Sequence, residues 1–286
     1  MGPPGLKKGD IKMGLFSVDK KKCKCDGLCA AVCPIRIIKF NNSERIPYPL
    51  DNAEELCINC GHCLAVCPYG ALSLSAMSLD SCQQLKPGWR IPPDKIELFL
   101  KGRRSVRIYK PEPVERITLE KLIDIASYAP SGINRQPVNW AVILEPVKVK
   151  QLAEMVVNWM RVLIKDGSPL AASLRMEHIV SSWEKGEDWI CRGAPHLVFV
   201  YALKDDMTAA QASTIALTYL ELAAASFNLG ACWAGYVSIA VNLSPEVRKF
   251  VGISLRTDCF GAMMIGHPGV SYSRIPLRNK PHIIWR

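Results

Sequence analysis

Cysteine is the residue type in this sequence with the clearest potential for chemistry. Twelve of the 286 residues are cysteines, and eight of them fall within one N-terminal stretch. These eight are Cys23, Cys25, Cys29, Cys33, Cys57, Cys60, Cys63 and Cys67. The sequence opens with MGPPGLKKGD, which has no apolar core of the kind found in signal peptides, so we do not expect a secreted disulfide framework. Clustered thiols in an intracellular chain predict metal binding.

The second group of four cysteines has a spacing that is specific for iron–sulfur chemistry. It reads C-x2-C-x2-C-x3-C and is followed by Pro68. In bacterial two-cluster ferredoxins, the first three thiolates of this run bind one cluster and the fourth binds the other. The ligands expected for one 4Fe–4S cluster are Cys33, Cys57, Cys60 and Cys63, and those for a second include Cys23, Cys29 and Cys67. A zinc site is disfavoured, because its four ligands come as two pairs rather than as a quartet ending in Cys-Pro.

An internal repeat places one such loop in each half of the cysteine-rich stretch. CKCDGLCAAVCP, residues 23–34, aligns with CINCGHCLAVCP, residues 57–68, at an offset of 34 residues. Each copy is followed by a strand-like run, IRIIKF or YGALSL. Two similar halves with one cluster loop each predict a small ferredoxin-like domain.

The first copy departs from the pattern at one ligand position. The alignment sets Asp26 opposite Cys60, while a thiol, Cys25, stands one residue earlier. Three outcomes remain open: Asp26 binds iron through a carboxylate oxygen, the loop shifts so that Cys25 binds, or the cluster lacks one iron. The preference of iron–sulfur sites for thiolate favours Cys25, whereas the register of the loop favours Asp26.

Two polar segments further along the chain are suited to a phosphate-bearing cofactor. The first, KGRRSVRIY at residues 101–109, offers guanidinium groups and a hydroxyl from Arg103, Arg104, Ser105 and Arg107. The second, YAPSGINRQPVNW at residues 128–140, sets polar side chains at the end of an expected helix. The sequence has neither a G-x-G-x-x-G loop nor a P-loop, so a Rossmann nucleotide site and an ATPase are not supported.

Together these two segments resemble the RxSxRxF-type and APSGxNxQPW-type motifs of the nitroreductase (flavin reductase) family. Three later stretches agree with the same family: GAPH at 193–196, GACWAGY at 230–236 and MMIGHPGVSYSRIPLR at 263–278. The resemblance extends from about Lys95 to the C-terminus. With the cysteine-rich half, the whole chain resembles ferredoxin-linked members of the nitroreductase family.

The resemblance implies an FMN site at the interface of a homodimer. One subunit would hold the phosphate, the ribityl chain and the pyrimidine end of the flavin with Arg103, Arg104, Ser105 and Arg107. The other subunit would reach over with Pro130, Ser131, Gly132, Asn134 and Gln136. Gly235 would lie beside the isoalloxazine, and Arg274, or else Arg278, would close the phosphate site. No side chain is assigned as a catalytic acid or nucleophile, because the flavin itself carries the redox chemistry.

The activity implied is that of an FMN-dependent reductase that passes electrons from two iron–sulfur clusters to a small electron-poor acceptor. Nitroaromatics and quinones fit the family, and activated alkenes or halogenated aromatics are alternatives. A further alternative is an electron-transfer protein without a small-molecule substrate of its own. Seven lysines among the first 24 residues suit an acidic electron donor such as reduced ferredoxin or flavodoxin.

These sites require two structural units, and the fold class that follows is α+β. We expect a tail over 1–16, a small two-cluster ferredoxin-like domain over 17–84, a Pro-containing linker over 85–93 and a mixed α/β nitroreductase-like FMN domain over 94–286. Within the last, apolar spacing predicts helices over 119–129, 149–164, 209–229 and 245–251. Strands are predicted over 140–144, 196–203 and 260–265.

Composition and charge restrict the class of protein. Hydrophobic residues make up 49% of the chain and charged residues 22%, which is typical of a globular protein. Thirty-six basic against 26 acidic side chains give a formal charge of +10. Two clusters and a flavin phosphate would offset much of this charge, so we expect no nucleic-acid partner. The apolar residues 209–229 are interrupted by polar side chains, Glu221 among them, and predict a buried helix in a cytoplasmic protein rather than a membrane span.

Overall fold

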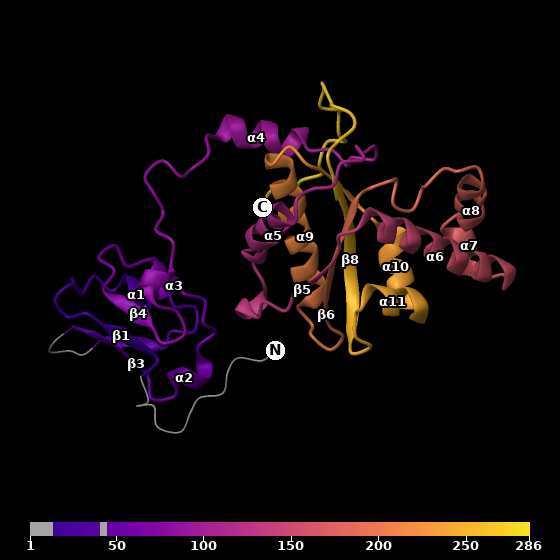
Figure 1. Ribbon diagram of the computed structural model, residues 1–286. Helices are drawn as coiled ribbons and strands as arrows, with labels where there is room; N and C mark the ends of the chain where they lie inside the picture. The colour runs from indigo at the N-terminus through magenta and orange to yellow at the C-terminus, as the bar shows by residue number, and fades with distance from the viewer. Residues whose placement is uncertain (1–13, 41–44) are drawn as a thin grey trace. The chain divides into compact units, whose positions relative to one another are not determined.

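The computed structural model describes residues 14–40 and 45–286, which form two compact units (Figure 1). The chain divides between Arg90 and Ile91, inside the segment LKPGWRIPP. We call the residues up to Arg90 the N-terminal unit and those from Ile91 the C-terminal unit. Most of the tail expected over 1–16 lies outside the described residues. No helix in the described ranges is long and apolar enough to cross a membrane.

The N-terminal unit consists of short elements joined by the cysteine-containing loops. Its strands form two antiparallel pairs, β1 (Phe16–Val18) with β4 (Leu72–Leu74) and β2 (Ile38–Phe40) with β3 (Pro47–Pro49). Its helices are single turns: α1 (Leu28–Ala31), α2 (Ala53–Leu56), α3 (His62–Ala65) and the 3-10 turn η1 (Leu79–Ser81). Two small apolar clusters form the core: Ile37, Ile38 and Ala53, and Leu64, Leu72 and Leu74. Units with so small a core usually gain stability from bound groups or cross-links.

The internal repeat of the sequence is also a repeat of secondary structure. The helices α1 and α3 are offset by 34 residues, and so are the strands β2 and β4. The glycines that precede the two helices, Gly27 and Gly61, have left-handed φ angles of 79° and 71°. Residues with a side chain rarely adopt this conformation, which explains glycine at both positions.

The C-terminal unit is built on one antiparallel sheet. Its strands are β5 (Asn139–Ile143), β6 (His196–Leu203), β7 (Gly230–Trp233) and β8 (Thr257–Gly266), in the order β5–β6–β8–β7. The helices that precede β6 are α4 (Pro93–Gly102), α5 (Arg116–Ser127), the 3-10 turn η2 (Gly132–Asn134), α6 (Pro146–Lys165), α7 (Pro169–Ser173) and α8 (Met176–Glu184). Those that follow are α9 (Ala209–Ser226), α10 (Gly235–Leu243) and α11 (Pro245–Val251).

Different helices cover the two faces of this sheet. Along β6, Leu197 and Phe199 belong to a core formed with α6, α8 and α10, whereas Val198 and Val200 belong to a core formed with α5 and α9. Such alternation is expected of a strand buried on both faces. Figure 1 shows α5 and α9 on one side of β8, and α10 and α11 on the other. The apolar composition of α9 therefore reflects burial within its own chain.

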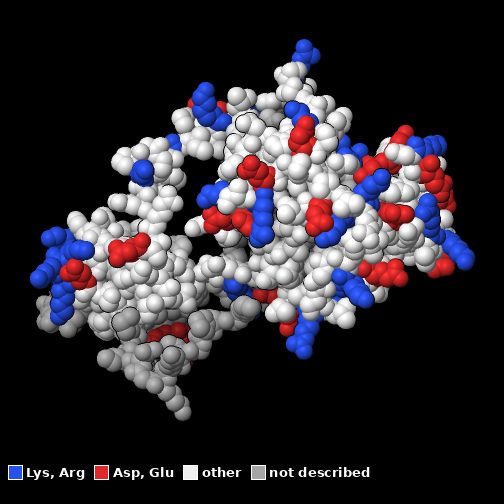
Figure 2. Space-filling view, viewed as in Figure 1, with Lys and Arg blue, Asp and Glu red and all other residues white. Residues whose placement is uncertain are grey.

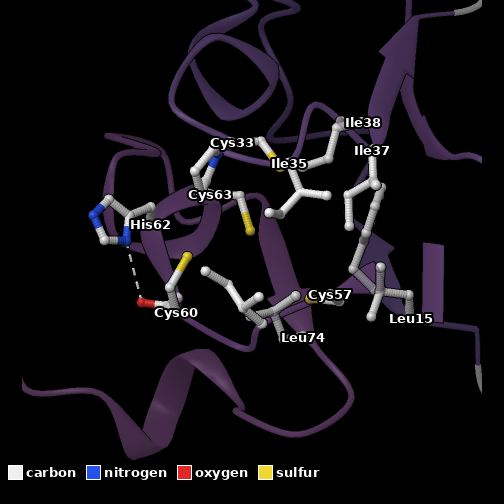
Figure 3. A pocket seen from close by; sticks show the side chains of 14 residues that line it. Leu15, Cys33, Ile35, Ile37, Ile38, Cys57, Cys60, His62, Cys63 and Leu74 are labelled. Atoms are coloured by element: carbon white, nitrogen blue, oxygen red, sulfur yellow. Dashed lines mark hydrogen bonds between the residues drawn. The ribbon is translucent and has the colours of Figure 1, made fainter. Parts of the chain in front are cut away.

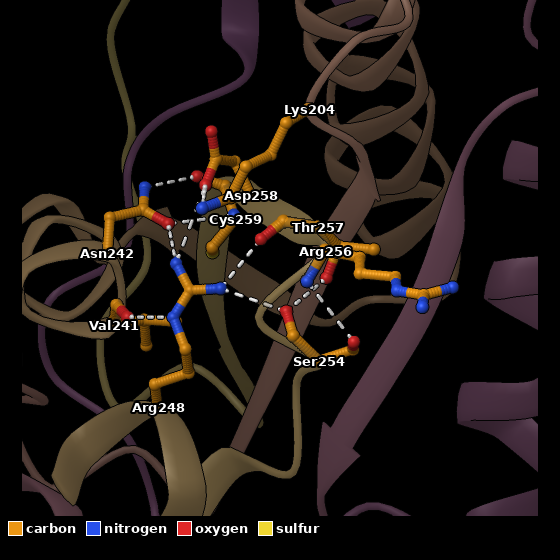
Figure 4. A network of polar contacts seen from close by, with 9 residues as sticks. All are labelled: Lys204, Val241, Asn242, Arg248, Ser254, Arg256, Thr257, Asp258 and Cys259. Atoms are coloured by element: carbon orange, nitrogen blue, oxygen red, sulfur yellow. Dashed lines mark hydrogen bonds and ion pairs between the residues drawn. The ribbon is translucent and has the colours of Figure 1, made fainter. Parts of the chain in front are cut away.

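A buried arginine joins α10 and α11 to the start of β8 (Figure 4). Arg248 on α11 is only 6% exposed, and its guanidinium group donates to the carbonyl oxygens of Val241 (3.1 Å), Ser254 (3.0 Å) and Thr257 (2.6 Å). It also donates to Oδ1 of Asn242 at 3.0 Å. A buried cation is tolerated when its donors are satisfied in this way. Arg248 therefore has a structural role.

The structure confirms most of the elements predicted for this unit. The strand predicted over 196–203 and the helix predicted over 245–251 are β6 and α11. The other predicted elements correspond to α5, α6, α9, β5 and β8, with small shifts at their ends. The sequence analysis missed α4, α7, α8, α10 and β7. In α10, GYVSIAVNL, apolar residues occur on every side, so no helical alternation marks it.

Candidate functional site

The first candidate site is a small cavity that we call the Cys60 cavity. It is lined by the four thiols Cys33, Cys57, Cys60 and Cys63, which are the set expected for one 4Fe–4S cluster. Figure 3 shows these side chains together with the apolar residues that complete the wall, among them Ile35, Ile37 and Leu74. An apolar wall limits access of solvent to a bound cluster and so affects its reduction potential.

The second candidate site is a small cavity that we call the Asp26 cavity. Its lining includes five groups able to bind iron: Cys23, Cys25, Asp26, Cys29 and Cys67. Three of these are the thiols expected for the second cluster, and the other two are the alternatives for its fourth ligand. Each cavity therefore combines the loop of one repeat with a cysteine from the other, Cys67 here and Cys33 in the Cys60 cavity.

The groups lining both cavities fit an iron–sulfur cluster better than a single ion. Among the described residues, no three His, Cys, Asp or Glu side chains converge closely enough to hold one metal ion. A 4Fe–4S cluster takes one ligand at each iron, so its ligands stand around a wide core rather than a point. Burial raises the pKa of Cys63 to about 11 and also raises that of Cys29, so these thiols need a strongly positive partner to bind as thiolates. The iron of a bound cluster would supply that charge.

The segment that carries the predicted flavin arginines runs beside β7. The Val106 N–H donates to the Ala231 carbonyl at 3.0 Å. The Val106 side chain fills the space at Gly230, where an added Cβ would lie 2.6 Å from a Val106 methyl, so only glycine permits this approach. β7 leads through Ala234 to Gly235, the first residue of α10. The structure therefore sets the predicted residues Arg103, Arg104, Ser105 and Arg107 along the strand that ends near Gly235.

The C-terminal tail passes the same segment. The Gly269 N–H donates to the Ile108 carbonyl at 2.8 Å, and the Tyr272 hydroxyl donates to the Ser105 carbonyl at 3.5 Å. Arg274, which is predicted to close the phosphate site, follows Tyr272 closely on this tail. The tail therefore belongs with the first half of the predicted flavin site.

Ion pairing distinguishes the arginines of this region. Nη1 of Arg103 lies 2.7 Å from Oε1 of Glu221 on α9, and the two side chains are 25% and 9% exposed. This pair fixes Arg103 and uses one of its guanidinium donors. Within the described residues, Arg104, Arg107 and Arg274 form no ion pair with a carboxylate. Unpaired guanidinium groups are suited to the phosphate and the pyrimidine edge of a flavin.

The sequence analysis missed one further arginine, Arg192. Burial raises the pKa of the Cys232 thiol on β7, and the charges of Arg107 and Arg192 oppose this rise, so both guanidinium groups lie near that thiol. The loop before β6 holds Arg192 in place, because the Asp188 carboxylate accepts three N–H groups of the loop at 2.8–2.9 Å. The Arg192 guanidinium also stacks 5.5 Å from the centre of the Trp189 ring. In the sequence, its position directly before GAPH was the available signal.

The second half of the predicted flavin site is the loop 130–136. The Ser131 hydroxyl oxygen accepts the N–H of Gln136 at 2.9 Å and so closes the loop. Three of its residues have left-handed φ angles: Ile133 (44°), Asn134 (56°) and Gln136 (47°). An ion pair between Arg135 Nε and Asp206 Oδ2, 3.2 Å apart, attaches the loop to the residues before α9. Strained backbone held by specific contacts is typical of binding loops.

The two halves of the predicted flavin site lie at opposite ends of α9. Gly132 packs against Thr208 beside the first turn, where an added Cβ would lie 2.9 Å from the Thr208 methyl. Arg103 pairs with Glu221 near the other end of the helix. At the usual helical rise, Thr208 and Glu221 are about 20 Å apart along the axis. A single chain therefore does not bring the predicted flavin-binding residues into one site.

Comparison with known protein families agrees with this division of the chain. Residues 100–267 match the nitroreductase family, and residues 21–71 match the 4Fe–4S dicluster domain. The first match covers more than half of the chain, and the second contains all the clustered cysteines. No curated protein matches the chain in a comparison of sequences.

Several solved structures have a similar fold. A nitroreductase with bound FMN from Bacteroides fragilis is 22% identical over 67% of this chain and 99% of its own, with a TM-score of 0.57. A nitroreductase with bound FMN from Desulfitobacterium hafniense is 20% identical over 68% of this chain and 100% of its own, with a TM-score of 0.55. Iodotyrosine deiodinase bound to FMN and 3-iodo-L-tyrosine is 21% identical over 67% and 98%, with a TM-score of 0.50. The chain therefore belongs to the nitroreductase family, with a 4Fe–4S dicluster domain fused before the family domain and the α+β fold that the sequence predicts.

Proposed function

We propose that this protein is an FMN-dependent reductase that takes electrons through two 4Fe–4S clusters and delivers them to a small electron-poor acceptor of the nitroaromatic or quinone type. The observation that carries the proposal is that one chain combines two cysteine-lined cavities with a nitroreductase-family domain in which Arg104 and Arg107, beside β7, form no ion pair with any described carboxylate. Clusters transfer single electrons, whereas a bound flavin can collect single electrons and release them in pairs. The combination suits reduction of an acceptor that needs two electrons.

The residues proposed to hold FMN are those already positioned along β7. Arg104 and Arg107 would bind the phosphate and the pyrimidine edge, and Arg192 would add a third cation near Arg107. Gly235 borders open space, because a Cβ added there would meet no atom within 4 Å. A flat ring system can therefore approach the backbone at the start of α10.

We further propose that the protein acts as a homodimer in which each flavin site takes residues from both chains. This proposal is supported by the distance along α9 that separates the two halves of the site within one chain. In a dimer with two-fold symmetry, the first half from one chain can lie next to the second half from the other chain. The loop 130–136 of one chain would then meet the segment 103–107 of the other.

Subunit complementation tests this arrangement directly. Arg107→Ala and Asn134→Ala are each expected to weaken FMN binding, and the two variants are then co-expressed with different affinity tags. If sites are shared, the mixed dimer has one intact site and one doubly defective site, so it binds about half of the FMN that the unaltered protein binds. If each site lies within one chain, the mixed dimer has no intact site and stays defective.

We propose reduced ferredoxin or flavodoxin as the electron donor. The described lysines Lys20, Lys21, Lys22 and Lys24 are exposed, whereas Lys7, Lys8 and Lys12 lie outside the described residues. Figure 2 shows Lys and Arg side chains gathered on one side of the N-terminal unit. A basic surface attracts an acidic carrier, and salt screens this attraction over about 10 Å at 0.1 M. Turnover with ferredoxin should therefore fall as salt is added.

Anaerobic turnover of the cluster- and FMN-loaded protein tests the reaction. Nitroaromatics and quinones are offered with reduced ferredoxin or with NADPH as donor, and we expect ferredoxin to support the faster rate. Rapid reduction of the flavin without turnover of any acceptor would contradict a reductase and indicate an electron carrier. Efficient NADPH-driven turnover by a variant without clusters would contradict electron entry through the N-terminal unit.

A further inference from the structure

The two cysteine loops have the same backbone conformation at equivalent positions. Three pairs of residues, each offset by 34 positions, have left-handed φ angles. They are Cys25 (55°) and Asn59 (49°), Gly27 (79°) and Gly61 (71°), and Arg36 (58°) and Gly70 (56°). Left-handed backbone is uncommon for residues with a side chain, so its recurrence at the same positions marks one shared loop conformation.

Backbone hydrogen bonds follow the same correspondence. The Ala31 N–H donates to the Gly27 carbonyl at 3.0 Å, and the Ala65 N–H donates to the Gly61 carbonyl at 2.9 Å. If the first loop were shifted by one residue so that Cys25 reached the ligand position, these two hydrogen bonds would no longer lie at equivalent positions of the two loops. The first loop is therefore unshifted, and Asp26 occupies the position that Cys60 has in the second loop.

The Asp26 carboxylate is held at this position. Its Oδ1 accepts the N–H of Leu28 at 3.1 Å, and no other described residue hydrogen-bonds to it, so Oδ2 remains available. The side chain lines the same cavity as the thiols Cys23, Cys29 and Cys67. The carboxylate thus completes a set of four groups around the Asp26 cavity.

Cys25 corresponds instead to Asn59, which belongs to neither expected ligand set. Oδ1 of Asn59 lies 3.8 Å from Sγ of Cys57, and the Cys25 thiol lies near the thiol of Cys23. Each of the two residues therefore stands beside the first ligand of its loop. This position suits support of a ligand sulfur rather than binding of iron.

We infer that Asp26 is the fourth ligand in the Asp26 cavity and that the iron it holds is exchangeable. Iron–sulfur sites prefer thiolate to carboxylate, so an oxygen ligand retains its iron less firmly than the three thiolates retain theirs. The inference rests on the proposal that both cavities bind clusters. The two clusters would then differ in how firmly they retain iron, and the cluster in the Asp26 cavity would be able to lose one iron and take up a metal ion in its place.

Controlled oxidation of the full-length, anaerobically reconstituted protein tests the inference. When one iron leaves as Fe²⁺ and one electron passes to ferricyanide, a [4Fe–4S]²⁺ cluster becomes [3Fe–4S]⁺, which EPR detects. The unaltered protein should lose about one iron per chain and recover it with Fe²⁺ and dithionite. Cys25→Ser should behave in the same way, whereas Asp26→Cys should retain its iron. The matched variant Cys60→Asp places a carboxylate at the equivalent position and should raise the loss to about two irons per chain.

Two results would overturn the inference. One is an Asp26→Ala protein that still holds a complete cluster in the Asp26 cavity while Cys25→Ser does not, which would make Cys25 the ligand. The other is a Cys60→Asp protein that loses no additional iron, which would show that a carboxylate at this position does not make iron exchangeable. Absence of iron and sulfide from both cavities would instead overturn the proposed function, so the two failures are distinguishable.

Discussion

The two units differ in how they gather the groups expected to bind a cofactor. In the N-terminal unit, one chain surrounds each cavity with its candidate ligands, because short loops and a crossing cysteine from the other repeat can wrap a compact cluster. In the C-terminal unit, the rigid helix α9 separates the two halves of the predicted flavin site. Under the proposed arrangement, we expect a single chain to load the clusters, whereas flavin binding would require association of two chains.

The largest effect should come from removing a thiol from the Cys60 cavity. Cys63→Ser takes away one candidate ligand, so ferredoxin-driven turnover should fall by about 100-fold while FMN content is unchanged. Iron analysis, flavin absorbance and turnover measure these quantities on one sample. Cys82→Ser is the control, since Cys82 lines neither cavity. Loss of FMN together with iron would show that the two units do not load independently.

Removal of the buried guanidinium group should affect the C-terminal unit alone. Arg248→Met removes the guanidinium donor from the carbonyls of Val241, Ser254 and Thr257, and we expect the free energy of unfolding to fall by about 3 kcal/mol. Six of the seven tryptophans lie in the C-terminal unit, so tryptophan fluorescence during denaturation reports mainly on this unit, while visible absorbance reports on the clusters. Arg256→Met alters an exposed neighbour and should leave both signals unchanged. An earlier loss of cluster absorbance would contradict independent stability of the units.

The unpaired arginines should matter for flavin and not for iron. Arg107→Ala and Arg192→Ala each remove a cation from the surroundings of Cys232, and we expect the Kd for FMN to rise about 10- to 100-fold. Fluorescence quenching of added FMN gives the Kd, and iron content is the internal reference. Arg161→Ala is the control, because Arg161 pairs with Glu184 at the surface. Unchanged FMN affinity in both variants would contradict the proposed location of the flavin site beside β7.

The smallest expected effect is a pH dependence confined to the C-terminal unit. His196 is buried, its Nε2 accepts the Val114 N–H at 2.7 Å, and its Nδ1 lies 2.7 Å from the Leu144 carbonyl. Burial lowers the pKa of His196, so the folded unit keeps the ring neutral where the unfolded chain takes up a proton. Its contribution to stability is complete above the usual histidine pKa of about 6.5 and declines as the pH falls below that value toward the folded pKa.

Denaturation at about pH 7.5 and about pH 5.5 measures this decline. His196→Gln should reduce the difference between the two pH values, since glutamine does not titrate. His178→Gln alters a more exposed ring that packs against Trp189, and it should leave the difference in place. Equal pH dependence in the unaltered protein and His196→Gln would assign the decline to other groups.

The candidate cluster ligands were predictable because their signal is local. Three closely spaced cysteines and a Cys-Pro pair define each loop within a dozen residues, and the structure brings the same thiols to each cavity. The strand β6 and the helix α11 were also predictable from the sequence. A continuous apolar run marks β6, and Ser244 and Pro245 mark the start of α11.

Contacts between distant segments were not predictable in the same way. The pairing of Arg103 with Glu221 depends on where α9 packs against the rest of the unit. The placement of Arg192 depends on the Asp188 carboxylate folding the loop before β6. Neither has a sequence spacing that identifies it, because the partners meet only through the tertiary fold. The choice between Asp26 and Cys25 likewise needed the backbone angles of both loops.

The loop 130–136 has a kinetic consequence. Its left-handed residues and its contacts through Ser131 and Arg135 are present in a single chain, so the loop does not need a second copy to reach this conformation. Encounters that need no refolding are limited by diffusion and orientation, and they proceed faster than encounters that must first order a segment. Under the proposed homodimer, two chains should therefore associate without a slow ordering step in this loop.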